Sequence, residues 1–126
     1  MNIKRLTRLK RNILKLKKFQ YKYEYTKSLD YGFTRNFEYA CCIDYIFQKK
    51  SASVLDIGSG RSIFPLFLAH HNHNVVQSDY DKCFNTQKNE INNSELKNLL
   101  DKKLNFTNLD SRKIPFKNNE FKFDNI

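Results

Sequence analysis

A chain of 126 residues with 40% hydrophobic residues is long enough for one domain with a modest core. It has no apolar run of about 18 residues and no apolar stretch at its N-terminus, which argues against a membrane span and a secretory signal. Three cysteines, two of them adjacent (Cys41 and Cys42), do not form a disulfide framework, so we expect a reduced, cytoplasmic protein.

The net charge of +10 is concentrated in residues 1–23, which contain nine Lys or Arg residues and no acidic residue. Apolar residues at positions 3, 6, 9, 13 and 16 recur at helical spacing, which predicts an amphipathic basic helix. Three roles stay open for it: packing on the domain or on a partner, contact with RNA or an anionic membrane, and organelle targeting.

Residues 20–33 are aromatic and polar and indicate a connector, whereas residues 34–50 indicate a helix that Thr34 can cap. We therefore divide the chain into a basic helix with its connector, residues 1–33, and a domain over residues 34–126. The predicted apolar side of the helix consists of Phe37, Cys41, Tyr45 and either Ile46 or Phe47.

In the rest of the chain, predicted strands and helices alternate. Strands are predicted at 53–57, 74–79 and 104–110, helices at 61–70 and 81–100, and a fourth strand begins at 121–126. This alternation predicts an α/β fold with a parallel sheet. In the second of these helices, Asp81 is the expected cap, and the expected inward residues are Ile91, Leu96, Leu99 and Leu100.

The stretch VLDIGSG, residues 54–60, joins a strand to a helix through two of the three glycines in the chain. Gly58 can adopt backbone angles that a side chain would forbid, and Gly60 lets the main chain approach a ligand. In open α/β sheets ligands bind beyond the carboxyl ends of the strands, so this loop predicts a nucleotide-type cofactor site.

The residues around the glycines favour one kind of cofactor. The third glycine of the dinucleotide fingerprint is absent, and the Asp56 carboxylate would repel a pyrophosphate. S-adenosylmethionine carries an ammonium and a sulfonium and no phosphate, so it suits this carboxylate better.

Three motifs in order, VLDIGSG, VVQSDYD (75–81) and NLDSRKIPFKNNEFKFDNI (108–126), resemble those of class I S-adenosylmethionine-dependent methyltransferases of the type 11-like group. The resemblance implies a Rossmann-like three-layer αβα fold with a parallel sheet, preceded here by the basic helix. It also implies methyl transfer from S-adenosylmethionine to an acceptor that the sequence does not identify. Ser62 stands where the family often has a third glycine.

Members of this family usually carry seven strands in the order 3-2-1-4-5-7-6. This chain supplies the first four and ends within the fourth. We therefore expect a fragment, a truncated gene product or a decayed copy.

Two aspartates at predicted strand ends have separate expected roles. Asp79 can accept both ribose hydroxyls as a bidentate pair, and Asp110 can accept from the adenine amino group while the Ser111 amide donates to the ring. Each aspartate can alternatively be a turn or helix-cap residue. The full cofactor-binding set predicted is Asp56, Gly58, Ser59, Gly60, Asp79, Tyr80, Asp110 and Ser111.

No nucleophile–base arrangement is present, so no catalytic residue is assigned. Tyr31 and Arg35 are candidates to contact the cofactor carboxylate, or else ordinary surface residues. The cluster HHNH, residues 70–73, has no cysteine or acid at ligand spacing, so we predict no metal site.

Two other functions remain open. The first is a nicotinamide-binding Rossmann domain, against which Asp56 and the missing third glycine argue. The second is a catalytically inactive Rossmann-like binding module whose basic helix contacts RNA or a membrane.

Overall fold

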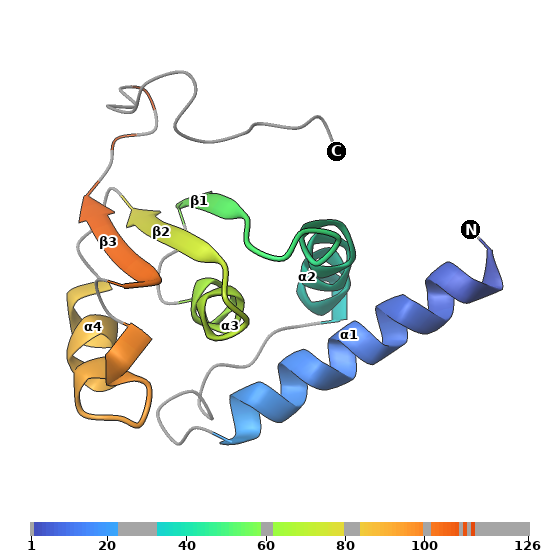
Figure 1. Ribbon diagram of the computed structural model, residues 1–126, viewed down its shortest axis with the longest axis horizontal. Coiled ribbons are helices and arrows are strands. Elements are labelled where there is room, and N and C mark those ends of the chain that lie inside the picture. Colours follow the sequence, from blue (N-terminus) through green and yellow to red (C-terminus); the bar gives the residue numbers. More distant parts are fainter. Residues whose placement is uncertain are drawn as a thin grey trace. The chain divides into compact units, whose positions relative to one another are not determined.

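The computed structural model describes residues 2–22, 33–58, 62–79, 84–99, 102–108, 110 and 112, which form an α/β protein (Figure 1). They divide into a helical unit, Met1–Lys50, and a sheet unit, Ser51–Ile126. The predicted methyltransferase-like domain over residues 34–126 is a different kind of division, and it stays a prediction. The elements are α1 (Ile3–Lys22), α2 (Phe33–Ile46), β1 (Ser53–Ile57), α3 (Phe64–His70), β2 (Asn74–Asp79), α4 (Phe84–Asn92), the 3₁₀-helix η2 (Lys97–Leu99) and β3 (Leu104–Asn108).

The three described strands form one parallel sheet in the order β1-β2-β3. Val54 pairs with Val75, and Val75 pairs with Leu104, so apolar residues of all three strands meet in one row. The predicted strands at 53–57 and 74–79 are confirmed to the residue, and the third ends at Asn108 instead of at residue 110. This sheet is compatible with a Rossmann-like fold. The predicted fourth strand, 121–126, lies outside the described residues.

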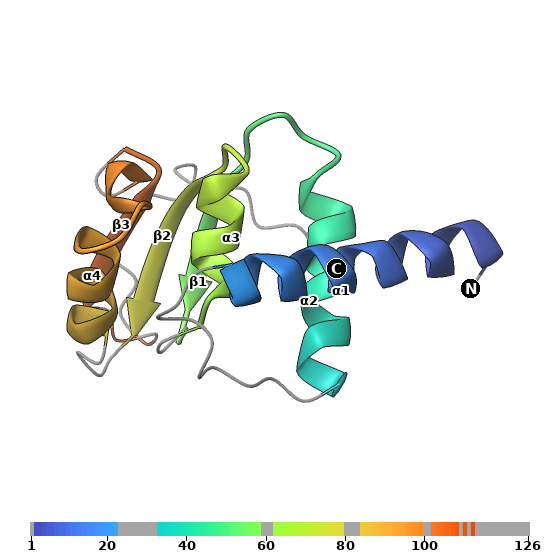
Figure 2. The ribbon, with the colours of Figure 1, turned by 90° about the horizontal axis from the view of Figure 1, so that it is seen from below.

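One face of the sheet is covered by α3 and α4, which lie on the same side of the strands (Figures 1 and 2). On that face Val75, Gln77 and Leu104 are buried, and α3 is buried from Phe64 through Ala69. Apolar residues all around a short helix are typical of a fully covered core element. The core of the sheet unit therefore lies between β2 and α3.

Helix α3 begins three residues later than predicted, at Phe64 instead of residue 61. The Ser62 hydroxyl accepts a hydrogen bond from the Phe64 backbone N–H at 3.2 Å. Pro65 lies in the first turn, where a missing backbone N–H has no helical partner to lose.

The predicted helix over 81–100 is wrong in its length, because α4 ends at Asn92 and η2 follows after a turn. Ser94 explains the break: its hydroxyl donates to the Ile91 carbonyl at 2.7 Å and accepts from the Leu96 N–H at 3.1 Å. Such short side-chain hydrogen bonds compete with the helical backbone pattern. Ile91 and Leu96 are buried as predicted, and Leu99 is half-buried. Asp81 and the Leu100 side chain lie outside the described residues.

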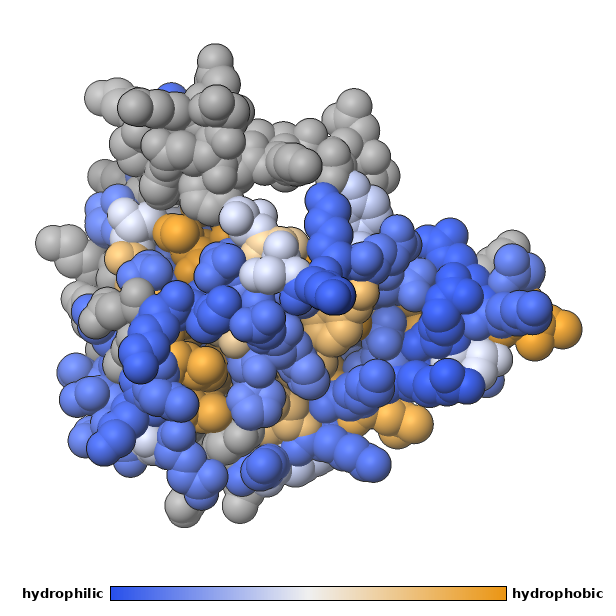
Figure 3. Space-filling view, in the orientation of Figure 1, coloured by the Kyte–Doolittle hydropathy of each residue, from blue (hydrophilic) through white to orange (hydrophobic). Residues whose placement is uncertain are grey.

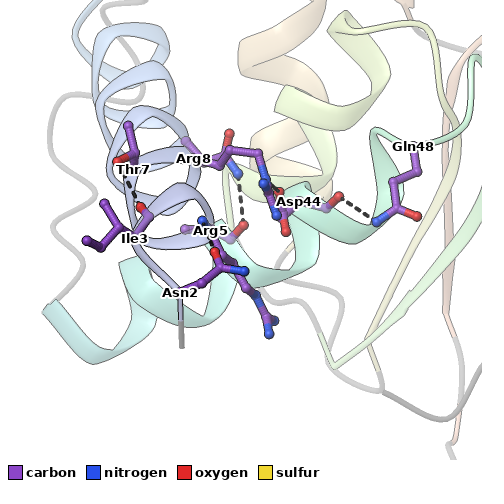
Figure 4. A network of polar contacts seen from close by, with 9 residues as sticks. Asn2, Ile3, Arg5, Thr7, Arg8, Asp44 and Gln48 are labelled. Carbon is purple, nitrogen blue, oxygen red and sulfur yellow. Dashed lines mark hydrogen bonds and ion pairs between the residues drawn. The ribbon is translucent and has the colours of Figure 1, made fainter.

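In the helical unit, Asn2 caps α1 by accepting a hydrogen bond from the Arg5 N–H at 2.8 Å (Figure 4). The buried residues of α1 are Leu9, Asn12, Leu16 and Phe19. The predicted apolar side is therefore wrong at its N-terminal end, where Ile3 and Leu6 are exposed. None of the described helices combines the length and the apolar character needed to cross a bilayer.

Helices α1 and α2 cross, and two polar contacts join them. The Asn12 side-chain amide donates to the Ala40 carbonyl at 3.1 Å, and the Arg8 guanidinium pairs with the Asp44 carboxylate at 2.9 Å (Figure 4). Among the described side chains of α2, Asn36, Ala40 and Ile43 are buried, whereas the predicted apolar side around Phe37, Cys41 and Tyr45 is only half-buried. Since α2 is apolar on several sides, periodicity alone did not single out the buried one.

A Schellman motif ends α3 and turns the chain into β2. The His73 N–H donates to the Leu68 carbonyl and the Asn72 N–H to the Ala69 carbonyl, both at 3.1 Å. Asn72 takes φ 75°, which is the left-handed conformation that this motif needs and that asparagine tolerates better than most residues.

Replacing Asn72 tests this turn. We expect Asn72→Ala to lower the free energy of unfolding by about 1 kcal/mol, because a Cβ is disfavoured at positive φ, and Asn72→Gly to stay within about 0.5 kcal/mol of wild type. Urea unfolding followed by circular dichroism measures both. Asn93→Ala, at an exposed position outside the left-handed region, serves as control. Equal losses in the two alanine variants would contradict this account.

Candidate functional site

The carboxyl ends of the three strands form the edge at which the sequence predicts a cofactor. Ile57 pairs with Ser78, so the next residues, Gly58 and Asp79, lie level with each other. Asp79 in turn pairs with Asn108 at the end of β3, and Asp110 follows two residues later. The sheet therefore brings four predicted site residues to one edge: Asp56, Gly58, Asp79 and Asp110.

The remaining predicted residues are not all part of this edge. Ser59, Gly60, Tyr80 and Ser111 lie outside the described residues, as does Tyr31. Arg35 belongs to the helical unit, where its guanidinium lies 3.9 Å from the Glu38 carboxylate and 5.9 Å from the centre of the Tyr39 ring.

Gly58 has the conformation expected of it, with φ 69°. Among the described residues, no atom lies within 4 Å of the position that a Cβ would take there. The backbone angle, and not crowding, is therefore what requires glycine at this position.

Asp56 and Asp79 lie on the sheet face that α3 and α4 cover. Asp56 pairs with Gln77, and Asp79 follows two residues after Gln77 on the same strand, so all three side chains project to one face. Both aspartates are half-buried. The Asp56 carbonyl accepts a hydrogen bond from the Ser78 hydroxyl at 2.8 Å, which ties β1 to β2 next to the edge.

Asp110 is held by Arg112 in a tight turn. Its carboxylate accepts from the Arg112 backbone N–H at 3.0 Å and from the guanidinium at 2.7 Å. The guanidinium first, and then the backbone N–H, holds the pKa of the Asp110 carboxyl below its usual range. Asp110 is thus a charged turn residue, and any ligand that contacts it meets a carboxylate already shared with Arg112.

A buried amide pair supports the segment that follows the glycine loop. The Gln77 side-chain amide donates to the Gln87 side-chain oxygen at 2.8 Å, and the Gln87 amide donates to the Ser62 carbonyl at 3.1 Å. Gln77 and Gln87 are fully buried. This chain of contacts joins β2, α4 and the start of α3. This chain of contacts was not predicted, although a glutamine in the inward row of an apolar strand is a usable signal.

The histidine cluster has structural partners. His70 and His71 are exposed at the end of α3, where the His71 ring lies 4.5 Å from the Phe67 ring. His73 is buried, and its Nδ1 accepts a hydrogen bond from the Ala52 N–H at 3.0 Å. In the described part of the chain, no group of three or more His, Cys, Asp or Glu residues could hold a metal ion.

The amino ends of the strands carry a second polar network, on the side opposite the candidate site. The Ser51 hydroxyl donates to the Asn72 carbonyl at 2.9 Å and accepts from the Asn74 amide at 3.2 Å, and Lys103 reaches Asn74 at 3.4 Å. With His73 and Ala52, these contacts fix the start of the sheet.

No protein-family model, curated protein or solved structure significantly matches this chain. The resemblance to methyltransferases therefore remains a hypothesis that rests on the motifs and on the geometry of the sheet edge.

His73 predicts a pH dependence of stability. Burial, and next the charge of Lys103, lower the pKa of His73, so the folded protein binds this proton less readily than the unfolded chain. The stability that the neutral ring contributes is present above about pH 6.5 and is lost as the pH falls below that value. We expect the melting temperature to fall from pH 7.5 to pH 5.5, and His73→Asn, which keeps an acceptor, to reduce this fall. His70→Asn should leave it unchanged, and an unchanged fall in His73→Asn would refute the assignment.

A double-mutant cycle tests the amide pair. We expect Gln87→Leu to lower the free energy of unfolding by about 1–3 kcal/mol, because the buried Gln77 amide loses an acceptor. Gln77→Leu should lower the free energy of unfolding less in the Gln87→Leu variant than in the wild type, since the two side chains interact. Urea unfolding of the four proteins measures the coupling, and additive losses would contradict it. Asn89→Leu, on an exposed position of α4, is the control.

Proposed function

We propose that this protein is an S-adenosylmethionine-dependent methyltransferase with a Rossmann-like three-layer αβα arrangement, which binds its cofactor at the carboxyl edge of the β1-β2-β3 sheet. The acceptor of the methyl group is left open. The described strands supply the edge, and the residues that would hold the cofactor are those that the motifs predict.

One observation carries the proposal: the register of β1 and β2 sets Gly58 level with Asp79. Neighbouring strands lie about 4.8 Å apart, so an open glycine backbone and a carboxylate face the same small space. A ribose that donates hydrogen bonds from both hydroxyls to the Asp79 carboxylate would then lie next to main chain that no described side chain covers.

The charges at this edge favour a cation over a pyrophosphate. Asp56 and Asp79 project to the same sheet face, so a pyrophosphate bound there would be repelled by both carboxylates. Asp110 contributes less, because Arg112 already neutralises it. The ammonium and sulfonium of S-adenosylmethionine fit such a site, whereas the phosphates of a nicotinamide dinucleotide do not.

When bound, S-adenosylmethionine would supply an activated methyl group. The described residues of this chain would contribute binding and orientation. Asp79 would fix the ribose, Gly58 would admit the amino acid part to the backbone, and Gln77 with Gln87 would hold the start of α3 in place.

Calorimetric titration of S-adenosylhomocysteine into the full chain tests the proposal. We expect binding that Asp79→Asn weakens about tenfold or more, because hydrogen bonds to a charged group contribute about 1.5–3 kcal/mol. Glu95→Gln, which removes an exposed carboxylate elsewhere in the sheet unit, should bind like wild type.

Circular dichroism verifies that each variant is folded. A folded wild-type chain that does not bind S-adenosylhomocysteine would overturn the proposal. Binding of NADH that depends on Asp79 would replace it with a nicotinamide site.

A further inference from the structure

Six of the nine basic residues of α1 form a single row, the cationic row. Its members follow one another at intervals of three or four residues, which places them on one side of a helix. All six are exposed, and α1 contains no acidic residue. They are Lys4, Arg8, Arg11, Lys15, Lys18 and Lys22.

The row borders a cleft between α1 and α2 within the helical unit. The cleft has a volume of about 430 Å³, and Arg8, Arg11 and Lys15 line it from α1. Asp44, the one acid among its lining residues, lines it from α2, and Phe47 and Gln48 line it from the turn that follows α2. Asp44 pairs with Arg8 at 2.9 Å, so Arg11 and Lys15 give the cleft its net positive charge.

The cationic row destabilises the isolated helix, because like charges three or four residues apart repel each other. Packing does not explain it, since the buried side of α1 is formed by Leu9, Asn12, Leu16 and Phe19. A polyanion lying along the row would remove this repulsion.

We propose that the cationic row and its cleft bind the phosphate backbone of a nucleic acid. From Lys4 to Lys22 the row spans about 27 Å, since a helix rises about 1.5 Å per residue. One strand of a duplex presents about eight phosphates over that length. The row of cations complements the phosphates that face it, and backbone contacts of this kind need no base sequence.

A lipid surface fits α1 less well. An in-plane membrane helix needs a free apolar side, but the continuous apolar side of α1 is buried. The exposed apolar residues Ile3, Leu14 and Tyr21 share their row with Lys10 and Lys17, which interrupt it. On the visible face of the molecule, apolar residues along α1 are likewise isolated among hydrophilic ones (Figure 3).

The test uses fluorescence anisotropy of the full chain with a labelled 20-nucleotide RNA, single-stranded and as a duplex, over a range of salt concentrations and without any cofactor. We expect binding that weakens steeply with salt. The double variant Arg11→Gln/Lys15→Gln should lose about tenfold or more in affinity, and the magnitude of its salt slope should fall by about 1.4 to 1.8.

The matched control is Lys10→Gln/Lys17→Gln, which removes the same charge from the same helix outside the row. It should lose at most about threefold. Asp44→Asn, which frees Arg8 from its ion pair, should bind severalfold more tightly.

Equal losses in the two double variants would overturn the proposal, because net charge alone would then explain binding. Weaker binding by a folded Asp44→Asn variant would also contradict it. If the chain binds phosphatidylserine vesicles and neither RNA, the surface is a membrane contact and the proposal is wrong. The inference does not rest on the proposed methyltransferase activity, and S-adenosylhomocysteine binding can fail or succeed independently of it.

Discussion

The parallel register of β1, β2 and β3 is the constraint on which the candidate site depends. Hydrogen-bonded pairing from Ser53 with Asn74 to Ile57 with Ser78 fixes which residues stand level at each end of the sheet. A shift of one residue would turn every side chain to the opposite face and separate Gly58 from Asp79. The amino ends, tied by His73 and Ser51, hold this register from the opposite side.

The two units combine apolar burial with a few polar contacts that determine geometry. In the sheet unit, the Gln77–Gln87 pair joins β2 to α4 and to Ser62, two residues before α3. In the helical unit, Asn12 performs a similar function by bonding a carbonyl of α2. Buried amides of this kind cost stability when they lose a partner, so they specify one packing arrangement more strongly than apolar contacts alone do.

Local signals predicted more than long-range ones. The strands at 53–57 and 74–79 were predicted to the residue, because apolar runs bounded by glycine, asparagine and serine mark them. The sequence also predicted the positive φ of Gly58. The break in α4 at Ser94, the amide pair and the burial of Asn12 were missed, since each depends on partners that only the folded chain supplies. Ile3 and Leu6 have helical spacing like Leu9, yet they are exposed. The methyltransferase assignment itself stays a prediction.

The charge pattern of α1 has a consequence for the folding of the helical unit. Added salt screens repulsion among the nine cations, over a Debye length of about 8 Å at physiological ionic strength, and so favours the helix. The buried residues of α1 are apolar or neutral, and Asn12 among them bonds the Ala40 carbonyl of α2, so salt weakens this packing little. Salt therefore raises the stability of this helix while it weakens the binding of polyanions to it. At low salt, α1 is accordingly least ordered and attracts polyanions most strongly.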